Sequence, residues 1–310
     1  QLMKIQIKEL TKVYPNGHRA LNCLNLDIEP GMFGLLGPNG AGKTSLMRIM
    51  TLLQSPSSGT ILFDDYDILR DRKAIRSVLG YLPQDFRFFE KLKTWEFLDY
   101  GAGLAGIKGT RKRAEVVDEL LRKVGLYEVR DRWANRLSGG MKRRLGIAQA
   151  IVGNPKVIIV DEPTTGLDPE ERIRFRNILS EVSDKDVIII LSTHIVGDIS
   201  STCKNLALLN KGELKFQGSP DDMIQLATGK VWEIFVTDPE LQQIKEKYPI
   251  ISTIPSEGGW EIQIVAENPE GFSGKQITPN IEHAYVYFMD YLLKDKMEMY
   301  SEKIGGELFQ

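Results

Sequence analysis

A glycine-rich loop of eight residues constrains the fold of this 310-residue chain more than any other feature. It reads Gly37-Pro38-Asn39-Gly40-Ala41-Gly42-Lys43-Thr44, with Ser45 next. The loop follows an apolar run, 32–36, that predicts a strand, and it opens helix-favouring sequence, 43–53. Backbone N–H groups of glycines at a helix start form a cradle for phosphate, Lys43 can reach the outer phosphates, and the Thr44 hydroxyl can bind Mg²⁺. The alternative, a plain glycine-rich turn, explains neither flanking element, so we predict a nucleotide-binding P-loop.

Two acids at the end of a second apolar strand narrow the chemistry. The run 156–160 predicts a buried strand, and Asp161 and Glu162 follow it directly. Ligands of parallel sheets bind at the carboxyl ends of the strands. Asp161 is placed to hold the Mg²⁺ shell, and Glu162 can polarise an attacking water. Taken alone, the two acids could also form an acidic turn that binds no ligand. The P-loop elsewhere in the chain favours the magnesium and water site over this alternative.

The remaining pattern predicts an α/β core. Apolar runs that do not alternate with polar residues indicate strands buried on both faces, as in a parallel sheet covered by helices. We expect further strands at 3–7, 23–28 and 187–191, helices at 140–152 and 170–182, a helical region over 94–124, and a hairpin at 205–217.

A Gly-Ser-Pro triplet at 218–220 predicts a domain boundary. Beyond it, the alternating segments 231–236 and 260–265 predict strands, and 281–293 predicts a helix. We therefore expect a first domain over 1–218 and a small α+β domain over 219–310.

Composition excludes several classes of protein. A net charge of −2 gives no basic surface for nucleic acid. The two cysteines, Cys23 and Cys203, lie far apart in sequence and predict neither a disulfide framework nor a zinc site. No run reaches the roughly 20 apolar residues that cross a bilayer, so the sequence predicts a soluble protein of a reducing compartment.

A third motif makes the assignment specific. Leu137-Ser138-Gly139-Gly140-Met141 precedes an apolar-periodic helix, about twenty residues before the Asp161 strand. A serine and bare amides at a helix start can bind phosphate, although a simple helix cap is the commoner meaning. Together with the P-loop and the acids, the motif resembles the signature of ABC ATPases. The resemblance covers residues 3–218 and departs at Met141, where the family usually has glutamine.

The resemblance implies roles for single residues. Tyr14 stands where an aromatic ring stacks on adenine, and Gln84 where a glutamine contacts Mg²⁺ and water and senses the membrane partner. Asp168 resembles the aspartate that crosses the dimer interface, and His194 the histidine that contacts the γ-phosphate. The implied ATP-binding residues are Tyr14 and 37–45, the catalytic residues Glu162, His194 and Gln84, the magnesium ligands Thr44, Gln84 and Asp161, and the residues acting in trans Ser138, Gly139 and Gly140.

The resemblance also implies a function. It predicts an ABC-type ATPase with ATP and Mg²⁺ as cofactors, built as a P-loop NTPase core with a parallel-rich sheet, an antiparallel β subdomain and a helical subdomain at about 86–153. The expected partners are a second ATPase subunit, identical or similar, and polytopic transmembrane permease subunits, with no nucleic acid. The expected location is the cytoplasmic face of the membrane. The P-loop region, residues 163–169 and segment 278–289 are similar to ATPases of bacterial drug, antibiotic or lipid exporters, which favours export.

The function, the aromatic segment and the C-terminal domain each fit more than one interpretation. The alternative function is a soluble ABC ATPase working on DNA, ribosomes or protein assembly, but the chain lacks a long coiled-coil insertion, a sequence repeat and zinc cysteines. The aromatic segment 85–89 fits either a docking surface or a packing contact of the helical subdomain. The C-terminal domain fits a dimer contact, a regulatory element or a plain appendage. His18 and His283 match no motif.

Overall fold

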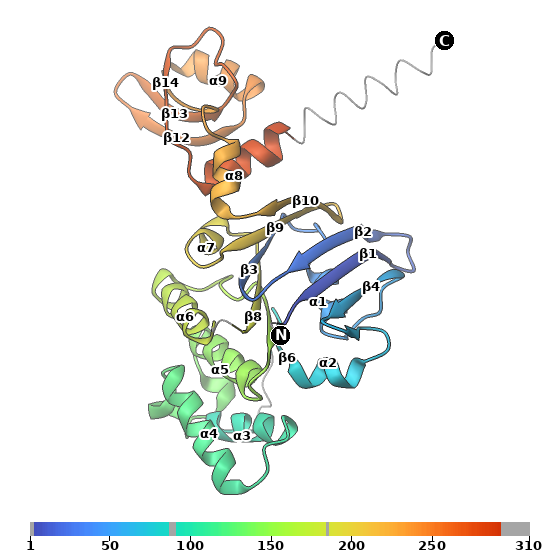
Figure 1. The fold of residues 1–310 in the computed structure, drawn as a ribbon. Helices are drawn as coiled ribbons and strands as arrows, with labels where there is room; N and C mark the ends of the chain where they lie inside the picture. Colours follow the sequence, from blue (N-terminus) through green and yellow to red (C-terminus); the bar gives the residue numbers. More distant parts are fainter. Residues whose placement is uncertain (1–2, 87–90, 184–185, 293–310) are drawn as a thin grey trace. The chain divides into compact units, whose positions relative to one another are not determined.

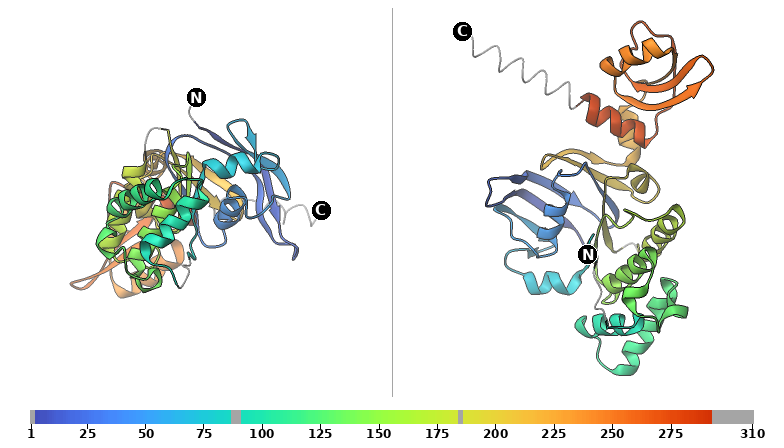
Figure 2. Two further views of the ribbon diagram at one scale, coloured as in Figure 1. Left: turned by 90° about the horizontal axis from the view of Figure 1, so that it is seen from below. Right: turned by 180° about the vertical axis from the view of Figure 1, so that it is seen from behind.

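The computed structural model describes residues 3–86, 91–183 and 186–292. It divides into two compact units, Gln1–Gln217 and Gly218–Gln310 (Figures 1 and 2). Most of segment 85–89 and all of the stretch 293–310 lie outside the described residues.

A six-stranded sheet forms the centre of the first unit. Its order is β10-β9-β3-β8-β7-β6. The bounds are β3(Gly31–Leu36), β6(Leu79–Leu82), β7(Val157–Asp161), β8(Ile188–Thr193), β9(Asn205–Asn210) and β10(Glu213–Gly218). Strand β3 pairs in parallel with β8 and β9, and β7 in parallel with β6 and β8. Every residue of β7 and β8 is buried, which confirms the prediction of strands covered on both faces.

A second, antiparallel sheet packs against the first through helix α1(Lys43–Met50). Its order is β2-β1-β4-β5. The bounds are β1(Ile5–Val13), β2(Arg19–Ile28), β4(Ser58–Phe63) and β5(Tyr66–Asp67). One core cluster contains Ile5 of β1, Phe33 of β3, Met47 of α1 and Ile159 of β7, so α1 lies between the sheets. The helix expected to reach residue 53 ends at Met50, because Leu52 takes a left-handed backbone with φ 64°.

Helices between β6 and β7 form a separate layer of the first unit. Helices α3, α4 and α5 contact one another, and α5 also contacts β6 (Figure 1). The helical bounds in this unit are α2(Arg72–Val78), α3(Thr94–Leu104), α4(Thr110–Lys123), α5(Gly139–Ile151), α6(Pro169–Val182), α7(Val196–Ser200) and the short 3-10 turns η1(Tyr127–Val129) and η2(Ala134–Arg136). The helical region expected at 94–124 is two helices, because Gly106 and Gly109 both have positive φ.

The second unit is a small α+β fold. Its sheet is antiparallel with order β12-β13-β11-β14. The bounds are α8(Pro220–Leu226), β11(Val231–Val236), α9(Asp238–Lys247), β12(Ile250–Ser256), β13(Gly259–Val265), β14(Gly274–Gln276), α10(Ile281–Val286) and the π-helix η3(Tyr287–Leu292). Ile234, Ile262 and Ile264 of the sheet pack with Ile244 of α9 in a core of their own. The helix expected over 281–293 is thus an α-helix that continues as a π-helix.

Candidate nucleotide site

The glycine-rich loop connects β3 to α1, as the sequence predicts, and two of its glycines have no substitute. Gly37 has φ 155°, and a Cβ added there would lie 2.3 Å from the Leu209 carbonyl oxygen. Gly42 has φ 104° and is the N-cap of α1, where a Cβ would lie 2.4 Å from the Ala20 carbonyl oxygen. Close backbone approach and positive φ together require glycine at both positions. The loop can therefore present its N–H groups and the start of α1 to an anion.

A cavity of about 290 Å³ opens over this loop. Residues 39–45 line it, together with His18, Ala20, Gln84 and Glu162. The P-loop, Gln84 and the second of the two acids thus meet in one place although Glu162 lies 117 positions after Ser45 (162 minus 45) in the sequence. The sequence predicts all of these contributors except His18 and Ala20.

Lys43 places a positive charge in the floor of the cavity. Its side chain is nearly buried, and its Nζ donates hydrogen bonds to the carbonyl oxygens of Gly37 (2.6 Å) and Pro38 (3.2 Å). The same Nζ lies 3.6 Å from Oε1 of Glu162. Burial lowers the pKa of Lys43 below its ordinary value, and the charge of Glu162 opposes that shift. A buried ion pair is weak evidence for stability, so its place in a phosphate cradle indicates a binding role.

Glu162 is the meeting point of the polar side chains. Its Oε2 lies 3.0 Å from Nδ1 of His194, and it accepts a hydrogen bond from the Thr165 hydroxyl at 3.3 Å. Its backbone is left-handed with φ 43°, a conformation that costs a non-glycine residue about 1–2 kcal/mol. The structure therefore brings together Lys43, Glu162 and His194, three side chains that the sequence selects separately. Strain concentrated at a residue of this kind is typical of functional sites.

Asp161 ends β7 and is buried beside the cavity. Its Oδ1 accepts a hydrogen bond of 2.5 Å from the Ser192 hydroxyl. Burial raises the pKa of the Asp161 carboxyl above its ordinary value, and that hydrogen bond opposes the shift. Burial and the nearby charge of Asp161 raise the pKa of Tyr81 to about 12. The end of β7 is therefore a desolvated strand end with two adjacent acidic residues, Asp161 and Glu162.

The donor set around the cavity suits Mg²⁺, which binds through one or two oxygen ligands and keeps waters and substrate phosphates. Thr44 and Gln84 line the cavity, and Asp161 lies one residue before Glu162. Within residues 3–86, 91–183 and 186–292, no three His, Cys, Asp or Glu side chains form a self-sufficient metal cluster. The residues present therefore fit a magnesium ion that arrives with a nucleotide.

Two aromatic rings, Tyr14 and His18, lie at one side of the site. The adenine-stacking role of Tyr14 stays a prediction. The Tyr14 hydroxyl hydrogen-bonds Ser45 Oγ (3.0 Å) and Gln54 Oε1 (3.1 Å), which fixes the ring beside α1. Tyr14 is not among the described residues that line the cavity, whereas His18 is. The two rings are nearly parallel, at 11°, with centroids 6.3 Å apart. The unassigned His18 thus belongs to the site, and the sequence signal for it is only its closeness to Tyr14.

The signature residues lie at the start of α5. Ser138 caps the helix, and its Oγ accepts a hydrogen bond from the Met141 N–H at 3.2 Å. Of the described residues that line the P-loop cavity, none is Ser138, Gly139 or Gly140. Gly139 instead lines a second cavity of about 330 Å³ together with Gln84, which also lines the P-loop cavity. The phosphate-binding role of the signature in trans stays a prediction.

Asp168 has a local structural contact. It caps α6, and its Oδ1 accepts a hydrogen bond from the Glu171 N–H at 2.9 Å. The side chain is exposed, so the cap and a contact with a second subunit are compatible. Its assigned role at a dimer interface stays a prediction.

Several polar residues that hydrogen-bond to the two acids, or lie next to those that do, were not predicted from the sequence. Ser192 contacts Asp161 and Glu162, and Thr165 contacts Glu162. Thr164 donates a 2.5 Å hydrogen bond to Asp198, and both are buried. The signal that could have found them is position, since 164–165 and 192 flank the motif residues Glu162 and His194.

Comparison with known proteins agrees with this geometry. The family profile described as "ABC transporter" matches residues 21–165. YxlF of Bacillus subtilis, an uncharacterized ABC transporter ATP-binding protein, is 33% identical over 88% of this chain and 89% of its own length. YbhF of Escherichia coli, a probable multidrug ABC transporter ATP-binding protein, is 36% identical over 73% of this chain, which spans 39% of YbhF.

A solved structure of an ABC transporter subunit has a similar fold. The structure of cbiO1 from Clostridium perfringens, described as part of the ABC transporter complex cbiONQ, is 27% identical with a TM-score of 0.66. The match covers 79% of this chain and all of cbiO1. Together with the P-loop, the strand-end acids and the signature, these findings establish that the chain belongs to the ATP-binding proteins of the ABC transporter family and is an ATPase.

Proposed function

We propose that this chain is the MgATP-driven motor subunit of an exporter whose membrane pore lies on a separate transmembrane protein. The observation that carries the proposal is that the P-loop cavity, as far as the described residues line it, includes Lys43 but none of the signature residues 138–140 at the start of α5. If the P-loop and the signature are the two halves of one nucleotide site but lie apart in the same chain, a second subunit is needed to bring one of each together.

Hydrolysis follows from the side chains around the cavity. Lys43 neutralises charge on the outer phosphates, and Glu162 accepts a proton from the attacking water. His194, which faces the Glu162 carboxylate at 3.0 Å, orients that carboxylate and contacts the γ-phosphate. Thr44, Asp161 and Gln84 would hold Mg²⁺, which supplies further charge neutralisation on the phosphates when bound.

A head-to-tail dimer completes each site. Ser138 and Gly139 are exposed at the start of α5, so a second subunit can approach them. The two subunits would then enclose ATP between the P-loop of one and the signature of the other. ATP would favour this closed state over ADP through its additional phosphate contacts, and such differential binding is what drives a conformational change.

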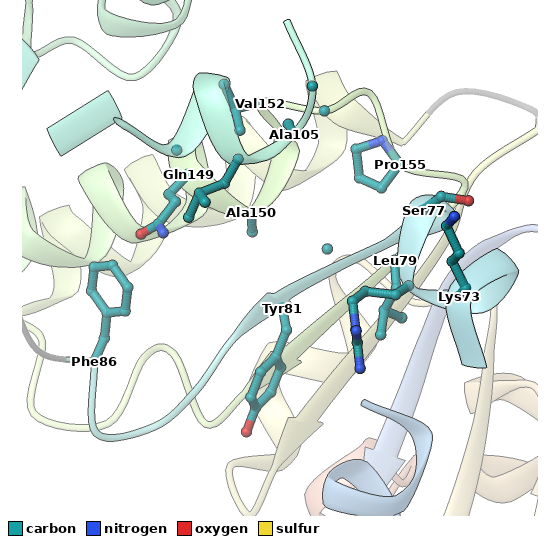
Figure 3. Close-up of a pocket in the computed structure, with 16 residues that line it drawn as sticks. Lys73, Ser77, Leu79, Tyr81, Phe86, Ala105, Gln149, Ala150, Val152 and Pro155 are labelled. Carbon is teal, nitrogen blue, oxygen red and sulfur yellow. The ribbon is translucent and has the colours of Figure 1, made fainter. Parts of the chain in front are cut away.

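A groove on the first unit suits a transmembrane partner. It has a volume of about 500 Å³ and lies between α2 and β6 on one side and α3 and α5 on the other. Leu79, Phe86 and Val152 give it apolar walls, and Lys73 stands at the end opposite Phe86 (Figure 3). Leu104 on its rim is 71% exposed. A docked segment would contact Tyr81 of β6, three residues before Gln84, and so reach the nucleotide site.

Export is supported by similarity, since YbhF is described as a probable multidrug protein.

None of the helices within the described residues is long and apolar enough to cross a membrane. An ABC ATPase with a role outside transport is the second candidate, and it would have no use for the groove.

The test is purification of the tagged full chain from membranes of its native cell. We expect a stoichiometric polytopic membrane protein, and we expect Leu104→Glu to abolish its recovery while the basal ATPase rate is unchanged. Ile173→Glu is the matched control, because Ile173 is 51% exposed on α6 outside the groove. Recovery of only ribosomal, DNA-bound or other non-membrane partners would contradict the transport proposal.

A further inference from the structure

Ser192 is a buried polar residue that contacts both strand-end acids. It lies near the end of β8, is fully buried, and pairs in register with Asp161 of the neighbouring strand β7. Paired residues of parallel strands point to the same side of the sheet, so the register puts the Ser192 side chain beside the first acid.

The Ser192 hydroxyl contacts both acids at once. It donates a 2.5 Å hydrogen bond to Oδ1 of Asp161 and accepts one of 3.1 Å from the Glu162 N–H. The Ser192 carbonyl oxygen accepts from the same N–H at 3.1 Å. In the part of the chain that the structure describes, no other side chain donates to Asp161. One hydroxyl group therefore fixes the direction of one carboxylate and the backbone of the next residue.

The backbone contact matters because Glu162 is left-handed, with φ 43°. In this conformation the chain turns sharply after β7, and the Glu162 carboxylate faces Lys43 (3.6 Å) and His194 (3.0 Å). An extended residue at this position would continue the strand instead. Holding the Glu162 N–H thus holds the carboxylate in the cavity.

We propose that Ser192 is a positioning residue for ATP hydrolysis, which orients Asp161 and keeps Glu162 in its left-handed turn. The inference rests on the roles proposed above for these two acids. Ser192 does not line the cavity among the described residues, so it acts through the acids and not on the nucleotide.

The test compares Ser192→Ala with Ser192→Thr in the full chain. We expect Ser192→Ala to lower kcat about 10- to 100-fold. This is the range typical of removing a group that orients a metal-ligating side chain, as Ser192 orients Asp161. The dissociation constant of ATP, measured by fluorescence of a trinitrophenyl analogue, should stay within about twofold because Lys43 and the P-loop are unchanged. Ser192→Thr restores the hydroxyl and should recover most of the turnover.

A control variant separates positioning from a general loss of stability. Thr94→Val also removes a fully buried hydroxyl, one that donates to the Arg132 carbonyl far along the chain from the acids. We expect it to lower the Tm about as much as Ser192→Ala and to leave kcat unchanged. If both variants lost turnover in proportion to Tm, Ser192 would have a structural role only and the inference would be wrong.

A double-mutant cycle with Glu162→Gln tests the route of the effect. Because Ser192 acts partly through Glu162, its removal should cost clearly less in the Glu162→Gln background than in the wild type. Fully additive losses would overturn the inference. Wild-type turnover of Glu162→Gln alone would instead overturn the role proposed for Glu162, so the two failures are distinguishable.

Discussion

Glu162 is the residue on which most of the site's contacts converge. Its carboxylate faces a buried lysine and a histidine, and its own backbone is strained. A group held in this way can accept a proton from water without a change in its position, which is how general bases contribute to rate.

The residue-scale prediction is that Glu162→Gln lowers ATP turnover by about 10²–10⁴-fold. Glutamine keeps the size and the hydrogen-bonding shape of the side chain but cannot take up a proton, so ATP should still bind. Steady-state ATPase assays and a direct binding measurement check both parts. Glu170→Gln is the matched control, since Glu170 is exposed on α6 and pairs with Arg174 across one helical turn. Near wild-type turnover in Glu162→Gln would contradict the assignment.

Sequence reasoning could select the charged residues of the site but not their supports. Lys43, Glu162 and His194 belong to motifs, and the structure places Lys43 and His194 each in contact with Glu162. Ser192 belongs to no motif, because its importance arises only from the register of β8 against β7. Their functional roles stay predictions until variants are measured.

At the scale of elements, α5 is held to α6 by a buried ion pair. Arg144 is 2% exposed, and its guanidinium donates to Glu171 (3.2 Å) and to the carbonyl oxygens of Val124 and Gly125. The Glu171 side chain also covers Gly140, where an added Cβ would lie 2.4 Å from its Oε2. One arginine thus joins the signature helix, α6 and the end of α4.

We predict that Arg144→Met destabilises the first unit by about 3 kcal/mol, because it removes the buried cation beside Glu171 and the donor to two carbonyl oxygens. Arg174, 3.5 Å from Oε1 of Glu171, remains as a partner of that carboxylate. For a unit of this size that corresponds to a fall in Tm of about 6–12 °C. Differential scanning calorimetry of the full chain measures it. Arg174→Met provides the comparison, since Arg174 is half exposed and its loss should shift the Tm by about 1 °C. Equal shifts in the two variants would contradict a special role for Arg144.

The elements that sequence reasoning located are the long apolar or periodic ones. Strands β3, β7 and β8 and helices α5 and α6 were expected close to their observed positions. Strands β4, β5 and β6 were missed because they are short or carry glycine and polar residues, and α9 was missed because only Leu241 and Ile244 of it are buried. Short elements depend on tertiary contacts, which a single sequence does not display.

At the scale of the molecule, the two units have separate hydrophobic cores. Strand β10, the last of the first unit, pairs with β9, and the chain then enters the second unit. Separate cores predict that the first unit folds without the second.

We therefore expect a chain that ends at Ser219 to hydrolyse ATP at a rate within about threefold of the full chain, because every residue of the site precedes that point. Gel filtration, circular dichroism and an ATPase assay check the prediction. A chain that ends at Asn210 is the comparison, since it lacks β10 and exposes the edge of β9, and we expect it to aggregate. Loss of folding in the longer chain would show that the second unit completes the first.

Strands β7 and β8 are buried along their whole length. A strand that alternates apolar and polar residues resists slippage, since a shift by one position would turn its apolar side to water. Uniformly aliphatic strands have no such pattern to fix their register. Ile-rich neighbours such as these could pair equally well with the register shifted by one residue. The polar residues at their ends supply the missing alignment, because Asp161 finds its hydroxyl partner only in the native pairing. Substitution of one aliphatic residue for another inside the sheet should therefore leave the strand register unchanged. The register that builds the site depends on the hydrogen bond between Asp161 and Ser192.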